Sequence, residues 1–521
     1  MLIDAFDRGA RLAPDAPCLQ MQDGSLTLTY RETDALAHRI AGALDAAGVG
    51  TQARVGVLSP NAPHAFCCIL GALRLNAVWV PLNTRAMPKD LVAMLTLTGC
   101  DALFYDPSLL DLATDVLDGL PAAPRVVVAT RAGGRDGDPV LGDWMAADGV
   151  RVPEPADAPD SLALLFGTGG TTGRSKAVRM RHRMMETMNL AFAAHLPEDE
   201  PPVMLMAAPM THAAGPICFP VFAQGGTVIV HDGVVPAAVL ASIERHRVTR
   251  LFLPPTAIYA LLADPGVRDH DYSSLRYFIY AAAPMAVDKL REAMDVFGPV
   301  MTQTFGQAEA PMIATVMTPR DHAEAVADDG KAARLFSAGR PSLVAKVAIL
   351  DPEGNVLGPG EEGEICVRGA LVMDGYHEDP EQTASTRRPG GWHGTSDVGR
   401  MDQDGFVYII DRLRDMIITG GFNVWPSEIE QTIHTVDGVK DCAVIGLPDE
   451  RWGEAVTAVV ELREGASVDA AAVIAACRER LGVVKTPKAV IFRELPRSPV
   501  GKVLKRTLRE EYWPAAGGRS V

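Results

Sequence analysis

The sequence predicts an α/β fold, in which a large N-terminal domain of parallel α/β layers with a small β-rich region precedes a small C-terminal α+β domain. At 521 residues the chain exceeds the size of one ordinary domain. Short apolar runs alternate with segments of helical spacing through most of its length, which is typical of parallel α/β layers. The pattern changes near residues 411–415, where a compact unit of about one hundred residues begins.

Local patterns predict the individual elements. A helix is expected after residues 29–32, where apolar residues keep helical spacing at Leu36, Ile40, Ala43 and Leu44. Buried strands are expected at residues 55–58, 78–82, 102–105, 125–128, 162–166, 227–230 and 250–253. Residues 344–367 carry short strands around a turn at residues 351–354, which indicates a hairpin-rich β region. Residues 153–159 and 323–333 read as loops.

Composition and charge exclude several classes of protein. The formal net charge of -16 argues against nonspecific nucleic-acid binding and gives no reason to expect an anionic membrane as partner. The amino terminus lacks the features of a signal peptide and no apolar stretch approaches a bilayer-spanning length, so a cytoplasmic protein without an integral membrane segment is expected. The eight cysteines contain no C-x-x-C pair, so neither a zinc site nor a disulfide framework is expected.

A segment rich in glycine and threonine, residues 167–176, follows the predicted strand at residues 162–166. Glycines let backbone N–H groups approach an anion, hydroxyls add donors and Lys176 adds charge, so the segment suits a nucleotide phosphate. A P-loop does not fit, because Gly173 is followed by Arg174, and the dinucleotide fingerprint fails at Thr172. A mobile surface loop is the alternative that glycine content alone permits.

The segment resembles the phosphate-binding loop T-S-G-T-T-G-x-P-K-G of the adenylate-forming (AMP-binding) superfamily, which includes acyl-CoA synthetases (carboxylic acid-CoA ligases), peptide-synthetase adenylation domains and luciferases. The chain departs from this pattern at Gly169, Ser175 and Ala177. The resemblance implies that the loop binds ATP and that Thr168 also serves a metal ion. The loop residues that it assigns to ATP are Thr168, Gly169, Gly170, Thr171, Thr172, Gly173 and Lys176.

A second segment, residues 303–309, resembles the family signature aromatic-G-x-T-E. The resemblance implies that Phe305 packs on adenine beside Gly306, and that Glu309 is a catalytic residue that holds Mg²⁺. Ala308 replaces the threonine of the signature, so one phosphate hydrogen bond is expected to be missing or supplied by another group. Core packing of Phe305 and a solvated carboxylate at Glu309 are the ordinary alternatives for each residue alone.

Further segments resemble the walls of the nucleotide and acyl sites. The resemblance assigns Asp397 and Arg412 to the ribose, and a carboxylate acceptor beside a guanidinium donor suits a diol. Ala281 and Ala282 stand where the family motif G-G-A-P has glycines, and the wall assigned to adenine and the acyl group is Ala282, Ala283 and Pro284. Residues 207–215 resemble the segment that gates the acyl site, with His212 as the candidate catalytic residue. A structural histidine and surface charges are the alternatives.

Two carboxy-terminal segments complete the resemblance. Residues 412–430 are similar to R-x-K-D-x-I-x-x-G-G-x-N-x-x-P-x-E-I-E, which implies that Gly420 and Gly421 line the pantetheine path and that Arg414 is a hinge. A hairpin turn followed by a helix after Pro426 is compatible with that role. Residues 496–506 resemble P-R-x-x-x-G-K, which implies that Lys502 is the catalytic cation that bridges the carboxylate and the α-phosphate.

The resemblance implies an N-terminal domain at residues 1–411 and a mobile C-terminal domain at residues 412–521. It implies an acid-thiol ligase (AMP-forming acyl-CoA synthetase) that uses ATP and Mg²⁺ to make an acyl-AMP and then transfers the acyl group to coenzyme A. Alanine-rich walls favour a medium- or long-chain fatty acid, an aryl acid or an alicyclic acid. A ligase that loads a carrier protein, a catalytically impaired nucleotide-binding regulator and a homodimer are left open.

Overall fold

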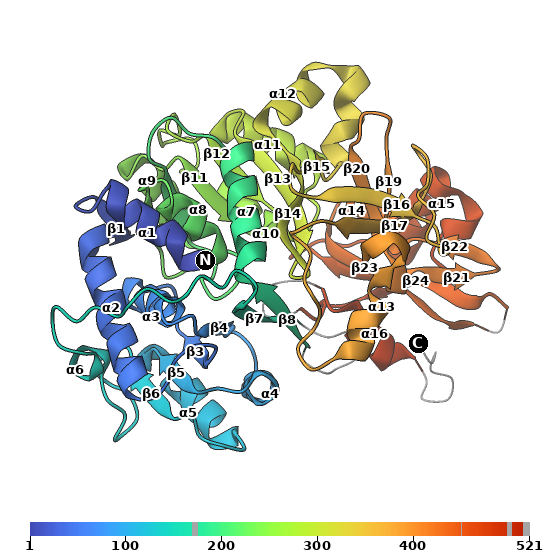
Figure 1. The fold of residues 1–521 in the computed structure, drawn as a ribbon. Helices are drawn as coiled ribbons and strands as arrows, with labels where there is room; N and C mark the ends of the chain where they lie inside the picture. Colours follow the sequence, from blue (N-terminus) through green and yellow to red (C-terminus); the bar gives the residue numbers. More distant parts are fainter. Residues whose placement is uncertain (169–175, 450, 498–502, 514–521) are drawn as a thin grey trace. The chain divides into compact units, whose positions relative to one another are not determined.

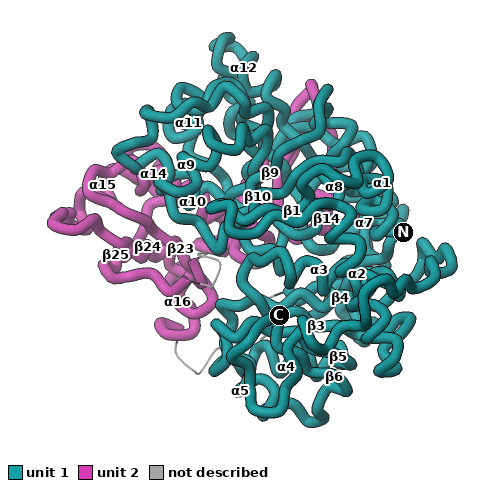
Figure 2. The backbone as a smooth tube through the Cα atoms, turned by 90° about the vertical axis from the view of Figure 1, so that its left-hand side faces the viewer, with its two compact units in different colours: residues 1–347, 367–393, 405–407 teal, residues 348–366, 394–404, 408–521 magenta. Residues whose placement is uncertain are grey.

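The computed structural model describes residues 1–168, 176–449, 451–497 and 503–513. The chain divides into two compact units, which Figure 2 shows in different colours. Unit 1 consists of residues 1–347, 367–393 and 405–407, and unit 2 of residues 348–366, 394–404 and 408–521. The predicted domain boundary at residues 411 and 412 lies within the last segment of unit 2 and stays a prediction.

A nine-stranded sheet forms one layer of unit 1 (Figure 1). Its strands, in spatial order, are β15 (Arg340–Pro341), β14 (Ala310–Met317), β13 (Met301–Gln307), β12 (Tyr277–Tyr280), β11 (Arg250–Leu253), β9 (Val203–Met206), β10 (Thr227–Val230), β1 (Pro17–Met21) and β2 (Thr27–Thr29). The strands from β13 to β1 pair in parallel, whereas β2, β14 and β15 pair antiparallel. Segments that follow the parallel strands therefore leave the sheet at one common edge.

A six-stranded sheet forms a second layer of unit 1. Its strands, in spatial order, are β6 (Val126–Ala129), β5 (Ala102–Tyr105), β3 (Arg54–Leu58), β4 (Val78–Pro81), β7 (Leu162–Thr168) and β8 (Lys176–Arg181). All neighbours pair in parallel except β8, which turns back antiparallel to β7. The buried strands and the parallel α/β layers predicted from sequence are confirmed.

Helices cover and separate these sheets. The helices of unit 1 are α1 (Leu2–Leu12), α2 (Tyr30–Ala46), α3 (Pro63–Arg74), α4 (Pro88–Thr98), α5 (Leu110–Gly119), α6 (Leu141–Trp144), α7 (His182–His195), α8 (Phe219–Phe222), α9 (Pro236–Arg245), α10 (Pro255–Leu262), α11 (Val287–Phe297), α12 (Pro319–Ala327) and α13 (Pro380–Ser385). Helix α3 contacts β1 of one sheet and β3, β4 and β5 of the other, and residues 65–74 are all buried. It therefore belongs to the core of both layers.

Short 3₁₀ turns occur at η1 (Pro107–Leu109), η2 (Pro216–Cys218), η3 (Asp329–Phe336), η4 (Pro389–Gly391) and η5 (Leu413–Asp415).

No helix in the part of the chain that the structure describes is long and apolar enough to span a membrane.

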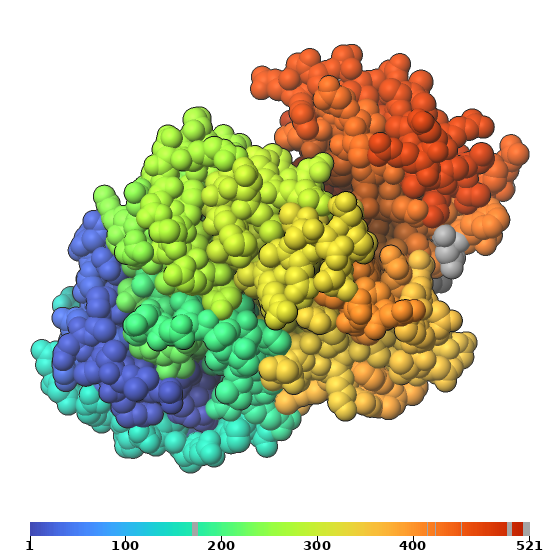
Figure 3. Space-filling view, turned by 90° about the horizontal axis from the view of Figure 1, so that it is seen from above, coloured from blue at the N-terminus to red at the C-terminus, as the bar shows by residue number. Residues whose placement is uncertain are grey.

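The helix predicted after residues 29–32 is confirmed as α2. Its start is set by a capping box, because Thr29 accepts a hydrogen bond from the Glu32 N–H and the Glu32 carboxylate accepts one from the Thr29 N–H. Helix α1 packs against α2, α3, α7 and α8, and in Figure 3 the blue surface of the first residues borders the green surface of unit 1. Helix α1 is thus part of the packed helices of unit 1.

The prediction of a loop at residues 323–333 is wrong, whereas the loop at residues 153–159 is confirmed. Helix α12 runs to Ala327 and the 3₁₀ turn η3 follows it. The helix begins with a capping box between Thr318 and Asp321, and Pro319 occupies its first turn. These start signals lie upstream of the segment that was read as a loop.

The predicted β region at residues 344–367 is confirmed. It contributes β16 (Lys346–Leu350) and β17 (Gly363–Arg368) to a five-stranded sheet of order β16-β17-β19-β18, in which β20 pairs with β19. The remaining strands are β18 (Arg387–Arg388), β19 (Trp392–Met401) and β20 (Val407–Arg412).

Within unit 2, the chain from residue 417 onward forms a small α+β layer. Its sheet contains β22 (Phe422–Val424), β21 (Ile417–Thr419), β24 (Gly453–Leu462), β23 (Val439–Asp449) and β25 (Ala489–Phe492), and its helices are α14 (Pro426–His434), α15 (Ala470–Lys485) and α16 (Lys505–Tyr512). Successive residues of β23 face opposite sides, so Val444 joins a core with α14 and α15, whereas Ala443 and Ile445 join a core with Leu508 of α16. The predicted α+β domain class is confirmed.

Candidate active site

Three of the predicted site segments leave the nine-stranded sheet at the same edge. Residues 207–215 follow β9, residues 281–285 follow β12, and the turn at residues 308–309 follows β13. These strands run parallel in the order β9-β11-β12-β13. The fold therefore gathers the predicted acyl gate, the predicted adenine wall and Glu309 along one rim, which is where open parallel sheets bind ligands.

The strands that flank the predicted phosphate loop form a hairpin. Thr168 is the last residue of β7 and Lys176 the first of β8, and the two are partners in the antiparallel register. The hydroxyl and the ammonium predicted to contact ATP phosphates are thus brought to one end of the hairpin. Gly169, Gly170, Thr171, Thr172 and Gly173 lie outside the described residues.

A ring contact ties this hairpin to the edge of the other sheet. The Phe166 ring of β7 and the exposed His212 ring meet edge to face, with centroids 5.3 Å apart and an interplanar angle of 69°. His212, predicted to gate the acyl site, therefore lies next to the strand that leads into the phosphate loop.

Asn61, which sequence reasoning missed, supports the segment predicted to gate the acyl site. Its amide Nδ2 donates to the carbonyls of Ala208 (3.0 Å) and His231 (2.9 Å), and its Oδ1 accepts from the N–H of Met210 (2.7 Å). The side chain is buried, so water cannot replace these hydrogen bonds if one of them is broken. Asn61 follows β3 of the six-stranded sheet and so joins the two layers beside His212.

The predicted alanine-rich wall is partly core. Ala207, Ala208 and Ala214 are buried, whereas His212 and the adenine-wall residues Ala282, Ala283 and Pro284 are exposed. The exposed residues are the ones in a position to meet a ligand, and the buried alanines fill the space behind them.

Gly306 is required by a close approach between β13 and β14. A Cβ atom on Gly306 would lie 2.6 Å from both the Ala310 carbonyl oxygen and the Met312 nitrogen. Both of those atoms belong to the backbone and cannot move aside as a flexible side chain would. This bulged hairpin carries the half-buried Phe305 and turns the chain through Ala308 and Glu309.

The Glu309 carboxylate is held by Tyr376, a residue outside the predicted signatures. The Tyr376 hydroxyl donates to Glu309 Oε1 over 2.7 Å, and the Met373 N–H donates to the Glu309 carbonyl over 2.8 Å. Burial, followed by the nearby charge of Glu309, raises the pKa of Tyr376 above its ordinary value. The phenol therefore remains a donor at neutral pH.

A buried polar network lies next to the predicted adenine wall. The Tyr280 hydroxyl, at the end of β12, lies 2.9 Å from His322 Nε2 and 3.2 Å from Gln303 Oε1. Burial lowers the pKa of His322 to about 4, so the ring is neutral; its Nδ1–H donates to the Thr318 carbonyl and its Nε2 accepts from Tyr280. The network fixes the strand ends before Ala281 and before Phe305.

Ala282 adopts a backbone conformation that favours glycine. Its φ is +73°, in the left-handed region where a Cβ atom crowds the backbone. The family motif has glycine at this position, whereas here a residue with a methyl group adopts the left-handed conformation.

In unit 2 the two predicted ribose residues meet. Arg412 Nε lies 3.5 Å from Asp397 Oδ1, with Asp397 buried and Arg412 46% exposed. The preceding residue, Ser396, has a φ of +61° at another position where the family motif has glycine. A buried acceptor beside an exposed donor is suited to a vicinal diol.

The other predicted residues of unit 2 lie on the segment after β20. Gly420 and Gly421, with φ of +58° and +81°, form the two-residue turn between β21 and β22. Helix α14 starts at Pro426, as predicted. Arg414 belongs to the 3₁₀ turn η5, and Lys502 lies outside the described residues.

Mg²⁺ is compatible with the donors at this rim. In the described part of the chain no group of three histidine, cysteine or acidic side chains could hold a metal ion alone. A carboxylate with one oxygen bonded to Tyr376 still has lone pairs for a hard cation, and Mg²⁺ commonly combines one or two protein oxygens with phosphate and water. Glu309 and the Thr168 hydroxyl fit that pattern.

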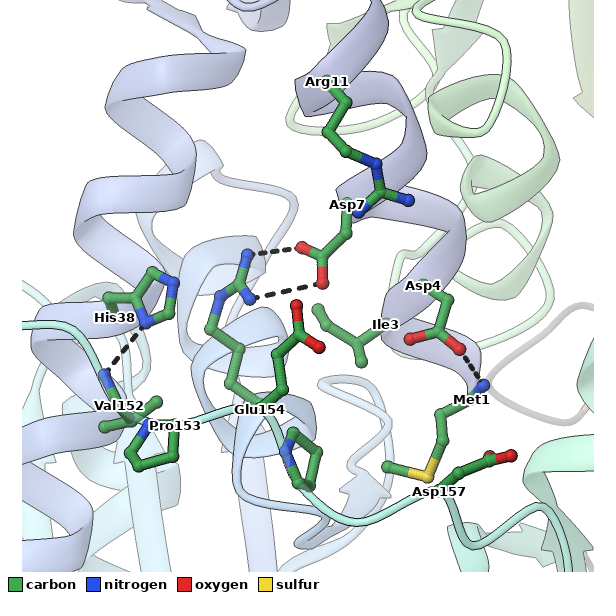
Figure 4. A pocket seen from close by; sticks show the side chains of 12 residues that line it. Met1, Ile3, Asp4, Asp7, Arg11, His38, Val152, Pro153, Glu154 and Asp157 are labelled. Carbon is green, nitrogen blue, oxygen red and sulfur yellow. Dashed lines mark hydrogen bonds and ion pairs between the residues drawn. The ribbon is translucent and has the colours of Figure 1, made fainter.

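A separate cavity of about 370 Å³ lies beside α1, α2 and residues 152–157 (Figure 4). Its buried cation, Arg74, is bonded to Asp7 (2.6 Å) and to Asp34, and His38 Nδ1 accepts from the Val152 N–H (3.2 Å). The cavity contains none of the predicted site residues, and its polar groups hold α1, α2 and α3 together.

We expect Ala282→Gly to raise the thermal unfolding midpoint, because it relieves about 1 kcal/mol of left-handed strain. Ala283→Gly is the matched control. Ala283 does not have a positive φ, so this substitution relieves no strain and only raises the entropy of the unfolded chain. Differential scanning calorimetry measures both midpoints. An equal or lower midpoint for Ala282→Gly than for the control would contradict the strain.

We expect Gly306→Ala to lower the unfolding midpoint and to weaken ATP binding, because the added methyl group would push β13 and β14 apart next to Phe305. Gly233→Ala is the control, since no atom lies within 4 Å of its added Cβ. Calorimetry and ATP titration check the two effects. Wild-type behaviour of Gly306→Ala would show that the hairpin tolerates the side chain.

Comparisons with known proteins agree with this arrangement. The AMP-binding enzyme family model matches residues 6–377, and the AMP-binding enzyme C-terminal domain model matches residues 428–502. A feruloyl-CoA synthase from Amycolatopsis sp is 37% identical over 513 residues, covering 97% of this chain and 98% of the relative. The medium/long-chain-fatty-acid–CoA ligase FadD8 of Mycobacterium tuberculosis is 37% identical over 492 residues, covering 91% of this chain and 84% of the relative.

A solved structure shows the same fold. The amide bond synthetase McbA from Marinactinospora thermotolerans is 29% identical, with a TM-score of 0.87 over 98% of this chain and 100% of that chain. The family resemblance predicted from the signatures is confirmed by these matches across both units. The chain therefore belongs to the AMP-binding enzyme family.

Proposed function

We propose that this AMP-forming acyl-CoA synthetase activates a carboxylic acid with a largely apolar body, such as a fatty, aryl or alicyclic acid. The observation that carries the proposal is the common rim formed by the segments after β9, β12 and β13, with the β7–β8 hairpin joined to it through Phe166 and His212. This arrangement supports the roles proposed for residues 207–215 at the acyl site, for residues 282–284 at the adenine, and for Thr168 and Lys176 at the phosphates.

The first half-reaction joins the acid to AMP and releases pyrophosphate. Lys176 and the phosphate loop neutralise the polyphosphate, while Phe305 and residues 282–284 hold the adenine and Asp397 with Arg412 hold the ribose. Glu309 and Thr168 hold Mg²⁺, which neutralises charge on the phosphate oxygens when bound. The acid carboxylate attacks the α-phosphorus. Lys502 stabilises the negative charge on the carboxylate and α-phosphate oxygens during this attack.

The second half-reaction exchanges AMP for a thiol. The CoA sulfur attacks the acyl carbonyl carbon, and AMP leaves with the electrons of the cleaved C–O bond. For this step we propose that the C-terminal domain, residues 412–521, turns about Arg414 so that the Gly420–Gly421 turn replaces Lys502 at the site. The two positive-φ glycines present backbone without side chains to the pantetheine arm.

The acid class is supported by the residues of the rim and by the relatives. Residues 207–215 and 281–285 contain no lysine or arginine, so neither segment offers a partner for a second carboxylate. The two relatives are named for a feruloyl and a medium/long-chain fatty acyl product. Both names support an acid whose body is held by apolar contact.

The acceptor is tested by supplying thiols separately. With ATP, Mg²⁺ and a panel of fatty, aryl and alicyclic acids, we expect the purified protein to form an acyl-CoA that mass spectrometry detects. An acyl-carrier protein takes the place of CoA in the second arm. Acylation of the carrier protein with no CoA thioester would replace the proposed acceptor, and a dicarboxylic acid as the preferred substrate would contradict the proposed acid class.

We expect Lys502→Ala to reduce acyl-AMP formation by about a hundredfold or more, because one preorganised cation at a developing charge contributes that much. Thioester formation from supplied acyl-AMP should stay near the wild-type rate. Lys289→Ala, an exposed lysine on α11, is the control and should retain both half-reactions. Equal loss in the two half-reactions would contradict the role given to Lys502.

A further inference from the structure

Residues 373–382, which we name the clamp segment, support both charged groups of the proposed ATP site. Its backbone joins β8 through hydrogen bonds from the Arg179 N–H to the Gly375 carbonyl (3.1 Å) and from the His377 N–H to the Ala177 carbonyl (2.8 Å). At its start, the Met373 N–H donates to the Glu309 carbonyl. The hairpin that carries Lys176 and the turn that carries Glu309 are therefore fastened to one short stretch of chain.

Two side chains of the clamp segment reach the same two groups. The Tyr376 hydroxyl donates to Glu309 Oε1 (2.7 Å), while its ring lies 5.4 Å from the Lys176 ammonium. Lys176 donates to the amide oxygen of Gln382 in the first turn of α13. Tyr376 of the clamp segment thus contacts both the Glu309 carboxylate and the Lys176 ammonium, and Gln382 contacts the ammonium.

The clamp side chains are themselves held in place. The Tyr376 N–H donates to Thr383 Oγ1 (2.9 Å), whose hydroxyl donates to the Asp379 carbonyl (2.7 Å). Asp379 caps α13 by accepting from the Gln382 N–H (2.9 Å). Tyr376 is largely buried, so its hydroxyl bond is shielded from competing water.

We propose that Tyr376 and Gln382 are positioning residues for the nucleotide: Tyr376 orients the Glu309 carboxylate toward a divalent cation, and Gln382 orients the Lys176 ammonium toward the phosphates. The inference rests on the proposed roles of Glu309 and Lys176. Tyr376 engages one carboxylate oxygen, so the carboxylate cannot rotate freely and its remaining lone pairs keep one direction. A preoriented ligand binds a cation without losing that rotational freedom.

The test for Tyr376 is the effect of Mg²⁺ on ATP affinity, measured by calorimetric titration in excess Mg²⁺ and in excess EDTA. Tyr376→Phe removes the hydroxyl and keeps the ring beside Lys176. We expect the gain in affinity that Mg²⁺ provides to fall about tenfold, as for the loss of one hydrogen bond to a charged group, with little change in EDTA. An unchanged gain, or an equal loss in both conditions, would overturn the role of Tyr376.

Two further variants separate this inference from the proposed function and from a general loss of stability. Glu309→Gln should remove the effect of Mg²⁺ on ATP affinity; if it does not, the role of Glu309 fails before that of Tyr376 is reached. Tyr105→Phe is the matched control, because Tyr105 is also a buried tyrosine that donates to a carboxylate of unit 1, Asp138 (2.9 Å). It should leave the effect of Mg²⁺ unchanged.

Gln382 has its own test. Gln382→Glu keeps the shape of the side chain but turns the acceptor of Lys176 into a carboxylate, which competes with phosphate for the ammonium. We expect the affinity for ATP in EDTA to fall about tenfold, with the ratio between the Mg²⁺ and EDTA affinities kept. Wild-type affinity in EDTA, or a changed ratio alone, would overturn the role of Gln382.

Discussion

The parallel order of β9, β11, β12 and β13 is the constraint on which the candidate site depends. Parallel strands end at one edge, so segments separated by up to a hundred residues in sequence emerge side by side. Burial of the strands and of α3 between the two sheets keeps that edge in place. The packing of the hydrophobic core therefore sets the general positions of the segments that form the candidate site.

Finer placement comes from polar and aromatic contacts between the layers. Asn61 ties the loop after β9 to the end of β3, Phe166 meets His212, and the clamp segment joins β8 to the Glu309 turn. Each contact links chain segments that the sheets alone would leave independent. Breaking a buried hydrogen bond leaves a donor or an acceptor without a partner, which costs free energy. These links therefore hold the candidate site residues more rigidly than apolar packing would.

Sequence patterns predicted the layers of unit 1, the hairpin at Gly420 and Gly421, and α14 after Pro426, because periodicity, glycine and proline are local signals. They failed for α12, whose start signal at Thr318 and Asp321 lies before the misread segment. The roles of Tyr376 and Asn61 could not be predicted from local signals, since the carboxylate that the Tyr376 hydroxyl bonds lies 67 residues away and the partners of the Asn61 side chain lie 145 or more residues away. The signatures named the groups that would touch ATP but not the residues that hold those groups.

Exchange of labelled pyrophosphate into ATP, measured without CoA, tests the central claim most directly. It isolates the formation of acyl-AMP and is independent of the thiol. The account predicts exchange that requires an added carboxylic acid with an apolar body and is absent with buffer alone. ATP binding without exchange for any such acid would identify a nucleotide-binding protein that does not activate acids, and would contradict the account.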